Sequence, residues 1–158
     1  MGLALAPGIR DVLKRHQQTA PVKVGALAAD LGLTVLKSDL PAGISGMLLR
    51  DPKDSQKWII RVNRQEARNR QRFTIAHEIA HFLLHRDEIG GELTDDTFYR
   101  SGLSERREWE ANKLAADILM PWDLVRSLTD QRKLTPKELA GELEVSEAAM
   151  QIRLGLPT

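Results

Sequence analysis

The chain has 158 residues, 42% of them hydrophobic and 28% charged, and no apolar run long enough to cross a membrane, which is typical of one globular domain. Its 23 basic and 22 acidic residues give a net charge of +1, so no overall field attracts nucleic acid. The absence of cysteine excludes disulfides and thiolate metal sites, and any transition metal must therefore bind through imidazole and carboxylate groups.

Residues 1–33 are predicted to form two short helices. The first is an amphipathic stretch near Pro7–Gln18, and the second follows in VKVGALAADLGL and is closed by Gly32. The N-terminal residues lack the basic leader and long apolar stretch of a secretory signal. We therefore expect a cytoplasmic protein without a membrane partner.

The pattern changes from helix to strand between Thr34 and Asn63, where the chain contains LTVLKSDL, GISGMLLR and KWIIRVNR. Turn signals separate these stretches at 41–43 and 51–54. The segment is predicted to form a short antiparallel sheet of three strands.

The last of these strands is a candidate substrate-binding edge. Side chains alternate along a strand, so Ile59, Arg61 and Asn63 share one face. We expect this strand to offer an edge to which an extended peptide substrate adds.

The next segment, ARNRQRFTIAHEIAHFLLHRD, has apolar residues at helical spacing around a wide part of its circumference, which predicts a central helix. Its HEIAH motif places His77 and His81 one turn apart on one face, where both imidazoles can bind one metal ion. Glu78 projects from a neighbouring part of the surface, placed to take a proton from a metal-bound water. The pentapeptide alone also fits partly buried polar residues without a metal, so a third ligand is the deciding observation.

Residues 88–104 lack sustained periodicity and are interpreted as a long loop, after which Ser104 is predicted to cap a second central helix through ERREWEANKLAADIL. A catalytic zinc ion usually takes three protein ligands, so this helix should supply one. Glu108 and Asn112 lie on one stripe, which makes Glu108 the best third ligand. Asn112 is then predicted to accept a hydrogen bond from a ligand imidazole.

Two other residues are weaker candidates for the third ligand. His85 lies roughly 12 Å beyond His77 along the helix axis, too far for both to bind one ion, and is more suited to packing or to contact with substrate. Asp117 lies well around the second helix from Glu108 and is kept as a weak alternative.

The tail from 134 to 156 is predicted to form two short helices, capped by Thr135 and Ser146, with a helix-turn-helix pattern. Its last helix offers Gln151 and Arg153 but lacks the cluster of Arg, Lys and Asn that base edges and phosphates require. Direct DNA binding is therefore not expected, and packing or docking of a protein partner is favoured.

Two segments, RFTIAHEIAHFLLH and EWEANKLAADILMP, resemble the ImmA/IrrE family of bacterial zinc metallopeptidases, whose hallmark is HExxH followed by a helix of the ExEANxFAAxLLMP type. The GISGM and IRVN strands and the Val-Ser tail are also similar, so the resemblance covers most of the chain. It implies that His77, His81 and Glu108 bind zinc, that Glu78 is the catalytic glutamate and that Asn112 is a helix-stabilising amide.

The resemblance also implies a function: zinc-dependent, site-specific cleavage of a helix-turn-helix transcriptional repressor, which relieves repression in stress responses, mobile elements or toxin–antitoxin modules. Tyr99, Arg100 and His85 are candidate donors to the oxyanion that peptide hydrolysis develops. Mn²⁺ or Fe²⁺ stays open as the native ion, because a His₂Glu site does not strictly select zinc. The alternative is a regulatory protein- or DNA-binding module, such as a toxin or antitoxin, that keeps the fold with little protease activity.

Together these observations predict one α+β domain over 1–158 with a zincin-like core at 34–120. We expect the antiparallel three-stranded sheet to pack on the central HExxH helix, beside the second ligand-bearing helix. Small helical segments at 1–33 and 134–156 complete the domain at both ends.

Overall fold

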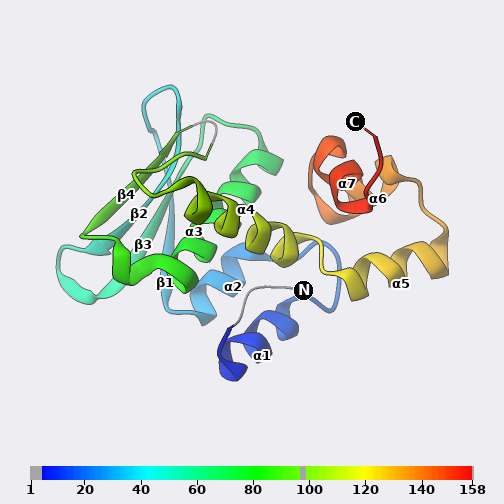
Figure 1. The fold of residues 1–158 in the computed structure, drawn as a ribbon, viewed down its shortest axis with the longest axis horizontal. Coiled ribbons are helices and arrows are strands. Elements are labelled where there is room, and N and C mark those ends of the chain that lie inside the picture. The colour runs from blue at the N-terminus through cyan, green and yellow to red at the C-terminus, as the bar shows by residue number, and fades with distance from the viewer. Residues whose placement is uncertain (1–4, 97–98, 158) are drawn as a thin grey trace.

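The computed structural model describes residues 5–96 and 99–157 and has the predicted α+β composition. The elements are α1 (Pro7–His16), α2 (Val24–Asp30), β1 (Leu33–Ser38), β2 (Ile44–Asp51), β3 (Asp54–Asn63), α3 (Arg68–His85), η1 (Arg86–Glu88), β4 (Glu92–Asp96), α4 (Glu105–Leu119), α5 (Trp122–Arg132), α6 (Pro136–Leu143) and α7 (Glu147–Leu154). Helix α3 lies against the sheet, and α5, α6 and α7 lie on the far side of the helical layer (Figure 1). Among the described helices, none combines the length and apolar character that a bilayer span needs.

The two N-terminal helices are present as predicted. Helix α1 begins at Pro7, where a residue without a backbone N–H costs the helix nothing. Leu13 of α1 and Leu27 of α2 are buried against the rest of the core. Gly32 then adopts a φ of +84°, a left-handed conformation that favours glycine, and turns the chain from α2 into β1.

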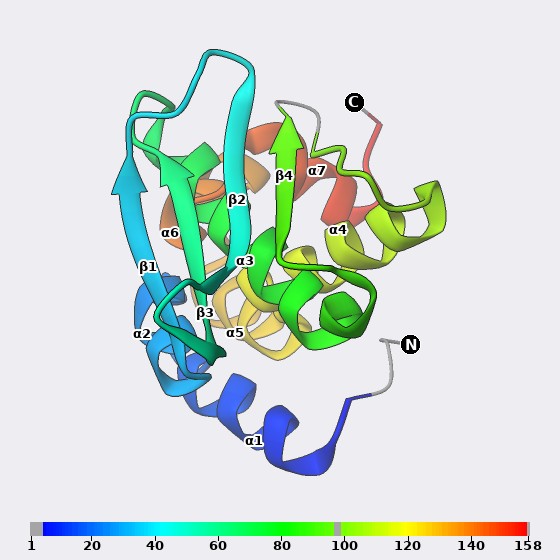
Figure 2. The same cartoon turned by 90° about the vertical axis from the view of Figure 1, so that its left-hand side faces the viewer.

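The sheet differs from the prediction in the number and direction of its strands. It has four strands in the order β1-β3-β2-β4, and β1 runs parallel to β3 (Figure 2). The fourth strand, β4, lies in the segment that was predicted to be a loop. Its sequence ELTDD is short and acidic, and such residues are depleted in strands, so only its pairing with β2 makes it a strand. The zincin-like assignment stays a prediction.

The predicted substrate edge at β3 is wrong, because β3 lies inside the sheet. Ile59 is paired with Thr34 of β1 and with Leu49 of β2, so the backbone of β3 has a neighbouring strand on each side. The side chain of Arg61 donates to Ser38 Oγ, and that of Asn63 donates to the carbonyl of Ile44. Ile59, Arg61 and Asn63 therefore join β3 to the strands on either side, and the outer strands of the sheet are β1 and β4.

The core lies between the sheet and α3. Ile79 of α3 and Ile60 of β3 are fully buried, and the ring of Trp58 meets that of Phe82 edge-on at a centroid distance of 6.2 Å. Across the other face of α3, the small side chains of Ala111 and Ala115 are buried in α4. They let the two central helices approach closely, as the site at their contact requires.

The C-terminal tail is anchored to both central helices. Arg72 of α3 is buried and donates to the carbonyls of Leu143 and Glu144 at the end of α6. Arg153 of α7 forms an ion pair of 2.9 Å with Asp117 of α4. These contacts hold α6 and α7 against α3 and α4, and the expectation that the tail does not bind DNA stays a prediction.

Candidate metal centre

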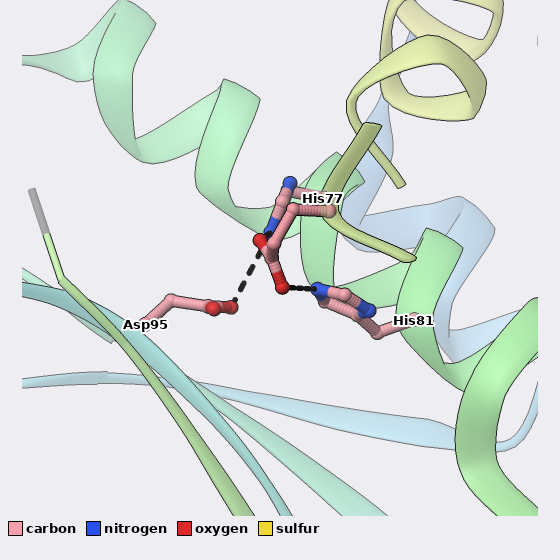
Figure 3. A group of neighbouring side chains, drawn as sticks. His77, His81 and Asp95 are labelled. Atoms are coloured by element: carbon pink, nitrogen blue, oxygen red, sulfur yellow. Dashed lines mark ion pairs between the residues drawn. The ribbon is translucent and has the colours of Figure 1, made fainter. Parts of the chain in front are cut away.

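The HExxH motif lies in the middle of α3, and both of its histidines are fully buried. The rings of His77 and His81 are 4.6 Å apart between centroids because a four-residue spacing stacks side chains on one helical face. Figure 3 shows both imidazoles directed toward the space that the carboxylate of Asp95 also faces. The sequence alone predicts this pair because both residues belong to one regular helix.

Glu108 reaches this pair from α4. Its Oε1 lies 3.3 Å from Nε2 of His77, and its Oε2 lies 3.2 Å from Nε2 of His81. Ser104 caps α4 by accepting from the backbone N–H of Arg107, which sets Glu108 in the first turn, and Ser101 Oγ donates to Glu108 Oε2. The structure thus brings together the three residues that were predicted to bind the metal.

Asp95 is a fourth member of this group that sequence reasoning missed. It is fully buried, and its Oδ2 lies 3.5 Å from Nε2 of His77. One ligand atom each from His77, His81, Asp95 and Glu108 all lie within 4.8 Å of one another. A signal was available in ELTDD, because the two-residue spacing of Leu93 and Asp95 places both on the buried face of β4.

The polar atoms of this group fit a cation. Among the described residues, both carboxylate oxygens of Glu78 and of Asp95 are buried without a hydrogen-bond partner, as are Nε2 of His81 and Oε1 of Glu108. Burying carboxylate groups in this way costs several kcal/mol each unless a charge compensates them. A divalent ion bound by imidazole nitrogen and carboxylate oxygen supplies that compensation, and this donor set suits zinc or a similar transition metal.

The pKa values in the group reflect the same crowding of charge. Burial lowers the pKa of His77, but the carboxylates of Asp95 and Glu108 outweigh it and raise this pKa from 6.5 to about 9. Burial raises the pKa of Glu108, but its interactions with His77, His81 and Ser101 outweigh it and lower this pKa to about 2. Imidazolium and carboxylate thus stabilise each other where a cation would otherwise do so.

Glu78 lies between α3 and β2, beside the four grouped residues. Burial, with the nearby carboxylates of Asp95 and Glu108, raises the pKa of Glu78 well above 4.5. The backbone of β2 approaches α3 at Gly46, where a Cβ atom would lie 3.4 Å from Glu78 Oε2 and 2.5 Å from Thr74 Cγ2. Only glycine allows this approach, so Gly46 helps to enclose the predicted catalytic carboxylate.

The predicted role of Asn112 is not found, and His85 takes its place. Asn112 Oδ1 is buried without a hydrogen-bond partner in the described structure. Instead, Nδ1 of His81 lies 3.0 Å from Nδ1 of His85, and Nε2 of His85 lies 2.9 Å from Oε1 of Glu110. His85 is 2% exposed, so it orients a predicted ligand and is not placed to contact an oxyanion.

Three other predicted site residues, Tyr99, Arg100 and Asp117, lie in different parts of the structure. Tyr99 has a ring centroid 5.2 Å from that of His77, and burial raises the pKa of its hydroxyl. The backbone N–H of Asp96 donates to the carbonyl of Arg100, and the backbone N–H of Arg100 donates to Asp96 Oδ1. Asp117 is bound to Arg153 outside the cluster, because nine residues separate it from Glu108, about 14 Å along a helix axis. Asp117 is therefore wrong as an alternative ligand, whereas Tyr99 stays a candidate donor.

An apolar pocket of about 320 Å³ opens beside the cluster. Phe73 and Tyr99 form its inner wall, with their rings 4.8 Å apart, and both rings also lie beside His77. The opposite wall comes from the tail, including Val145 and Ile152. The pocket therefore joins the candidate metal centre to the C-terminal helices.

Two histidines of an HExxH helix and a carboxylate from a second helix form a centre of the metallopeptidase class. The chain belongs to the peptidase M78 family, described as the IrrE N-terminal-like domain, whose sequence profile matches residues 28–155. This membership confirms the resemblance found in the sequence.

The chain is also similar to two known proteins. Over 88 residues the chain is 36% identical to the radiation response metalloprotease IrrE of Deinococcus deserti, a match that covers 55% of this chain and 31% of that protein. The fold is similar to that of a Mycobacterium tuberculosis transcriptional regulator, with a TM-score of 0.60 and 18% identity over 96% of this chain and 48% of the other. At that identity the likeness concerns the fold alone, and the chain spans less than half of that regulator.

Proposed function

We propose that the chain is a cytoplasmic zinc-dependent endopeptidase in which His77, His81 and Glu108 hold the ion and Glu78 is the general base. The observation that supports this most directly is the convergence of three side chains from α3 and α4 on one buried point. An ion held there would polarise the scissile carbonyl group and lower the pKa of a water molecule.

Glu78 performs the proton transfers in this proposal. Its buried position and neighbouring carboxylates raise its pKa, and a raised pKa makes its carboxylate a stronger base. It accepts a proton from the attacking water and returns it to the leaving nitrogen of the peptide. The hydroxyl of Tyr99, beside the ring of His77, is the candidate donor to the oxyanion.

The substrate peptide is held in an extended conformation along β4. This strand ends the sheet and pairs with β2 alone among the described strands, so its other edge can accept an added strand. A large apolar side chain of the peptide then enters the pocket lined by Phe73, Tyr99 and Ile152. Strand addition gives affinity, and the pocket gives preference for one bond.

The proposed substrate is a helix-turn-helix transcriptional repressor, whose cleavage relieves repression. The family resemblance supports this choice, and one relative is named a radiation response metalloprotease. Cleavage of such a repressor would allow transcription of the repressed genes in a stress response, a mobile element or a toxin–antitoxin module.

Metal content tests the centre. Plasma emission spectrometry on the purified wild type should give one zinc ion per chain, and Glu108→Ala should lose it. Glu78→Gln is the matched control: it should keep the ion while losing cleavage of a repressor encoded beside the gene. A wild type that holds no metal after zinc is added would overturn the proposal and favour a regulatory binding module.

A further inference from the structure

Asp95 adds a fourth potential ligand to a cluster in which three ligands would hold a catalytic ion. Its side chain is fully buried on β4, and both of its oxygens lack a hydrogen-bond partner among the described residues. Its Oδ2 is 3.5 Å from His77 Nε2, and its ligand atom lies within the same 4.8 Å group as those of His81 and Glu108. The ion pair with His77 leaves both oxygens without a hydrogen bond, and a cation bound between these groups would compensate their charge.

A catalytic ion normally keeps one position open, with three protein ligands and one site for water or substrate. Four protein ligands are instead typical of closed sites, in which the ion is not accessible. We propose, on the basis of the proposed function, that Asp95 is a fourth ligand that closes the resting centre. Asp95 must leave the ion before a substrate can bind to it.

The charge of the centre supports this role for Asp95. Two carboxylates, from Glu108 and Asp95, neutralise a divalent ion, whereas Glu108 alone leaves one positive charge beside the neutral imidazoles. An ion whose charge is cancelled by two anionic ligands is a weaker Lewis acid than an ion with one, so the release of Asp95 both opens a position and increases the polarising charge. Asp95 thereby holds the centre in a stable but less reactive state.

The location of Asp95 gives it a means of release. It lies at the end of a five-residue terminal strand, where the pairing of β2 with β4 shifts register between Ile44 and Gly46. Few backbone hydrogen bonds hold such a strand end, so its displacement costs less than that of a central strand. A peptide that adds to the edge of β4 moves the same strand that carries Asp95, which couples substrate binding to opening of the centre.

Cobalt-substituted protein tests the proposal without a substrate. Asp95→Asn should lower the affinity for Co²⁺ and Zn²⁺, measured by competition with a chelator, by at least about tenfold and should change the visible absorption of bound Co²⁺. Acetohydroxamate, a small bidentate metal ligand, should bind the Co²⁺ of Asp95→Asn more tightly than that of the wild type. Glu92→Gln, an exposed change on the same strand, should match the wild type in all three measurements.

A second variant, Asp95→Ala, keeps the test decisive if the amide distorts the site, and it should show the same changes. Equal metal affinity and equal Co²⁺ spectra in wild type and both variants would overturn the proposal. Asp95 would then act only on Glu78, by raising the pKa of that carboxyl group. A wild type that binds no Co²⁺ would overturn the proposed function as well, so the two failures are distinguishable.

Discussion

His81 and His85 face each other through their Nδ1 atoms at 3.0 Å, one turn apart in α3. If His81 uses Nε2 for the metal, its Nδ1–H donates to His85, whose own Nε2–H then donates to Glu110 at 2.9 Å. Burial lowers the pKa of His85, which favours the neutral ring that this arrangement needs. The chain of hydrogen bonds fixes both the tautomer and the orientation of His81.

Removal of this support should weaken metal binding. We expect His85→Ala and Glu110→Gln each to reduce zinc affinity by about 10- to 100-fold, because partners of metal ligands commonly have effects of this size. Chelator competition followed by circular dichroism measures affinity and folding on the same samples. His16→Ala, a histidine paired with Asp30 outside the cluster, is the control. Wild-type affinity in both variants would contradict the role of His85.

A methyl group at Gly46 should destabilise the fold and disturb Glu78. The Cβ atom of Gly46→Ala would lie 2.5 Å from Thr74 Cγ2 and 3.1 Å from the carbonyl oxygen of Arg61, so β2 must move away from α3. We expect a loss of about 1 to 3 kcal/mol in the free energy of unfolding, measured in urea, together with lower activity.

Two further variants distinguish this contact from a general effect of alanine. Gly141→Ala, in α6 with nothing within 4 Å of its added Cβ, should be neutral or slightly stabilising. Adding Thr74→Ser to Gly46→Ala removes the nearest methyl group and should recover part of the lost stability. A fully stable Gly46→Ala would argue against close contact between β2 and α3.

The metal-free protein should lose stability as pH rises from about 6.5 to about 9. Folding raises the pKa of His77 from 6.5 to about 9, so its protonation stabilises the folded state fully below 6.5, and this contribution disappears as pH passes 9. Glu78 acts in the same direction from pH 4.5 upward, because its raised pKa means that the unfolded chain releases that proton first. The expected decrease in the free energy of unfolding across this pH range is on the order of 2 to 3 kcal/mol.

Urea denaturation in EDTA at four pH values across this range measures the slope. His77→Gln has no imidazole to titrate at this position, so it should show a smaller decrease in stability with pH. A stability that is flat or rising from 6.5 to 9 in the wild type would show that the carboxylates do not hold a proton on His77.

The apolar pocket should control substrate preference without affecting the metal. Ile152→Glu places a charge on its outer wall, and we expect kcat/KM for substrates with a large apolar side chain at the cleavage site to fall about tenfold or more. Metal content should not change, because Ile152 lies outside the metal cluster. Leu156→Glu, an exposed apolar residue that does not line the pocket, is the matched control. An equal decrease in both variants would argue against a specific pocket.

The sequence by itself determined the parts of the site that depend on one helix at a time. His77, Glu78 and His81 follow from the 3.6-residue period of α3, and the stripe of α4 that carries Glu108 follows from the same period. The caps at Ser104, Thr135 and Ser146 were also predictable, because each depends on residues within four positions along the chain.

The tertiary structure decided what depends on pairing between distant segments. β3 became an internal strand because β1 pairs with it in parallel, and β4 became a strand, with Asp95 buried on its inner face, only because β2 lies beside it. The contact of His85 with Glu110, and the failure of Asn112 to reach a ligand imidazole, likewise depend on how α3 and α4 face each other. Local periodicity specifies the faces of each element, whereas the packing of elements decides which faces meet.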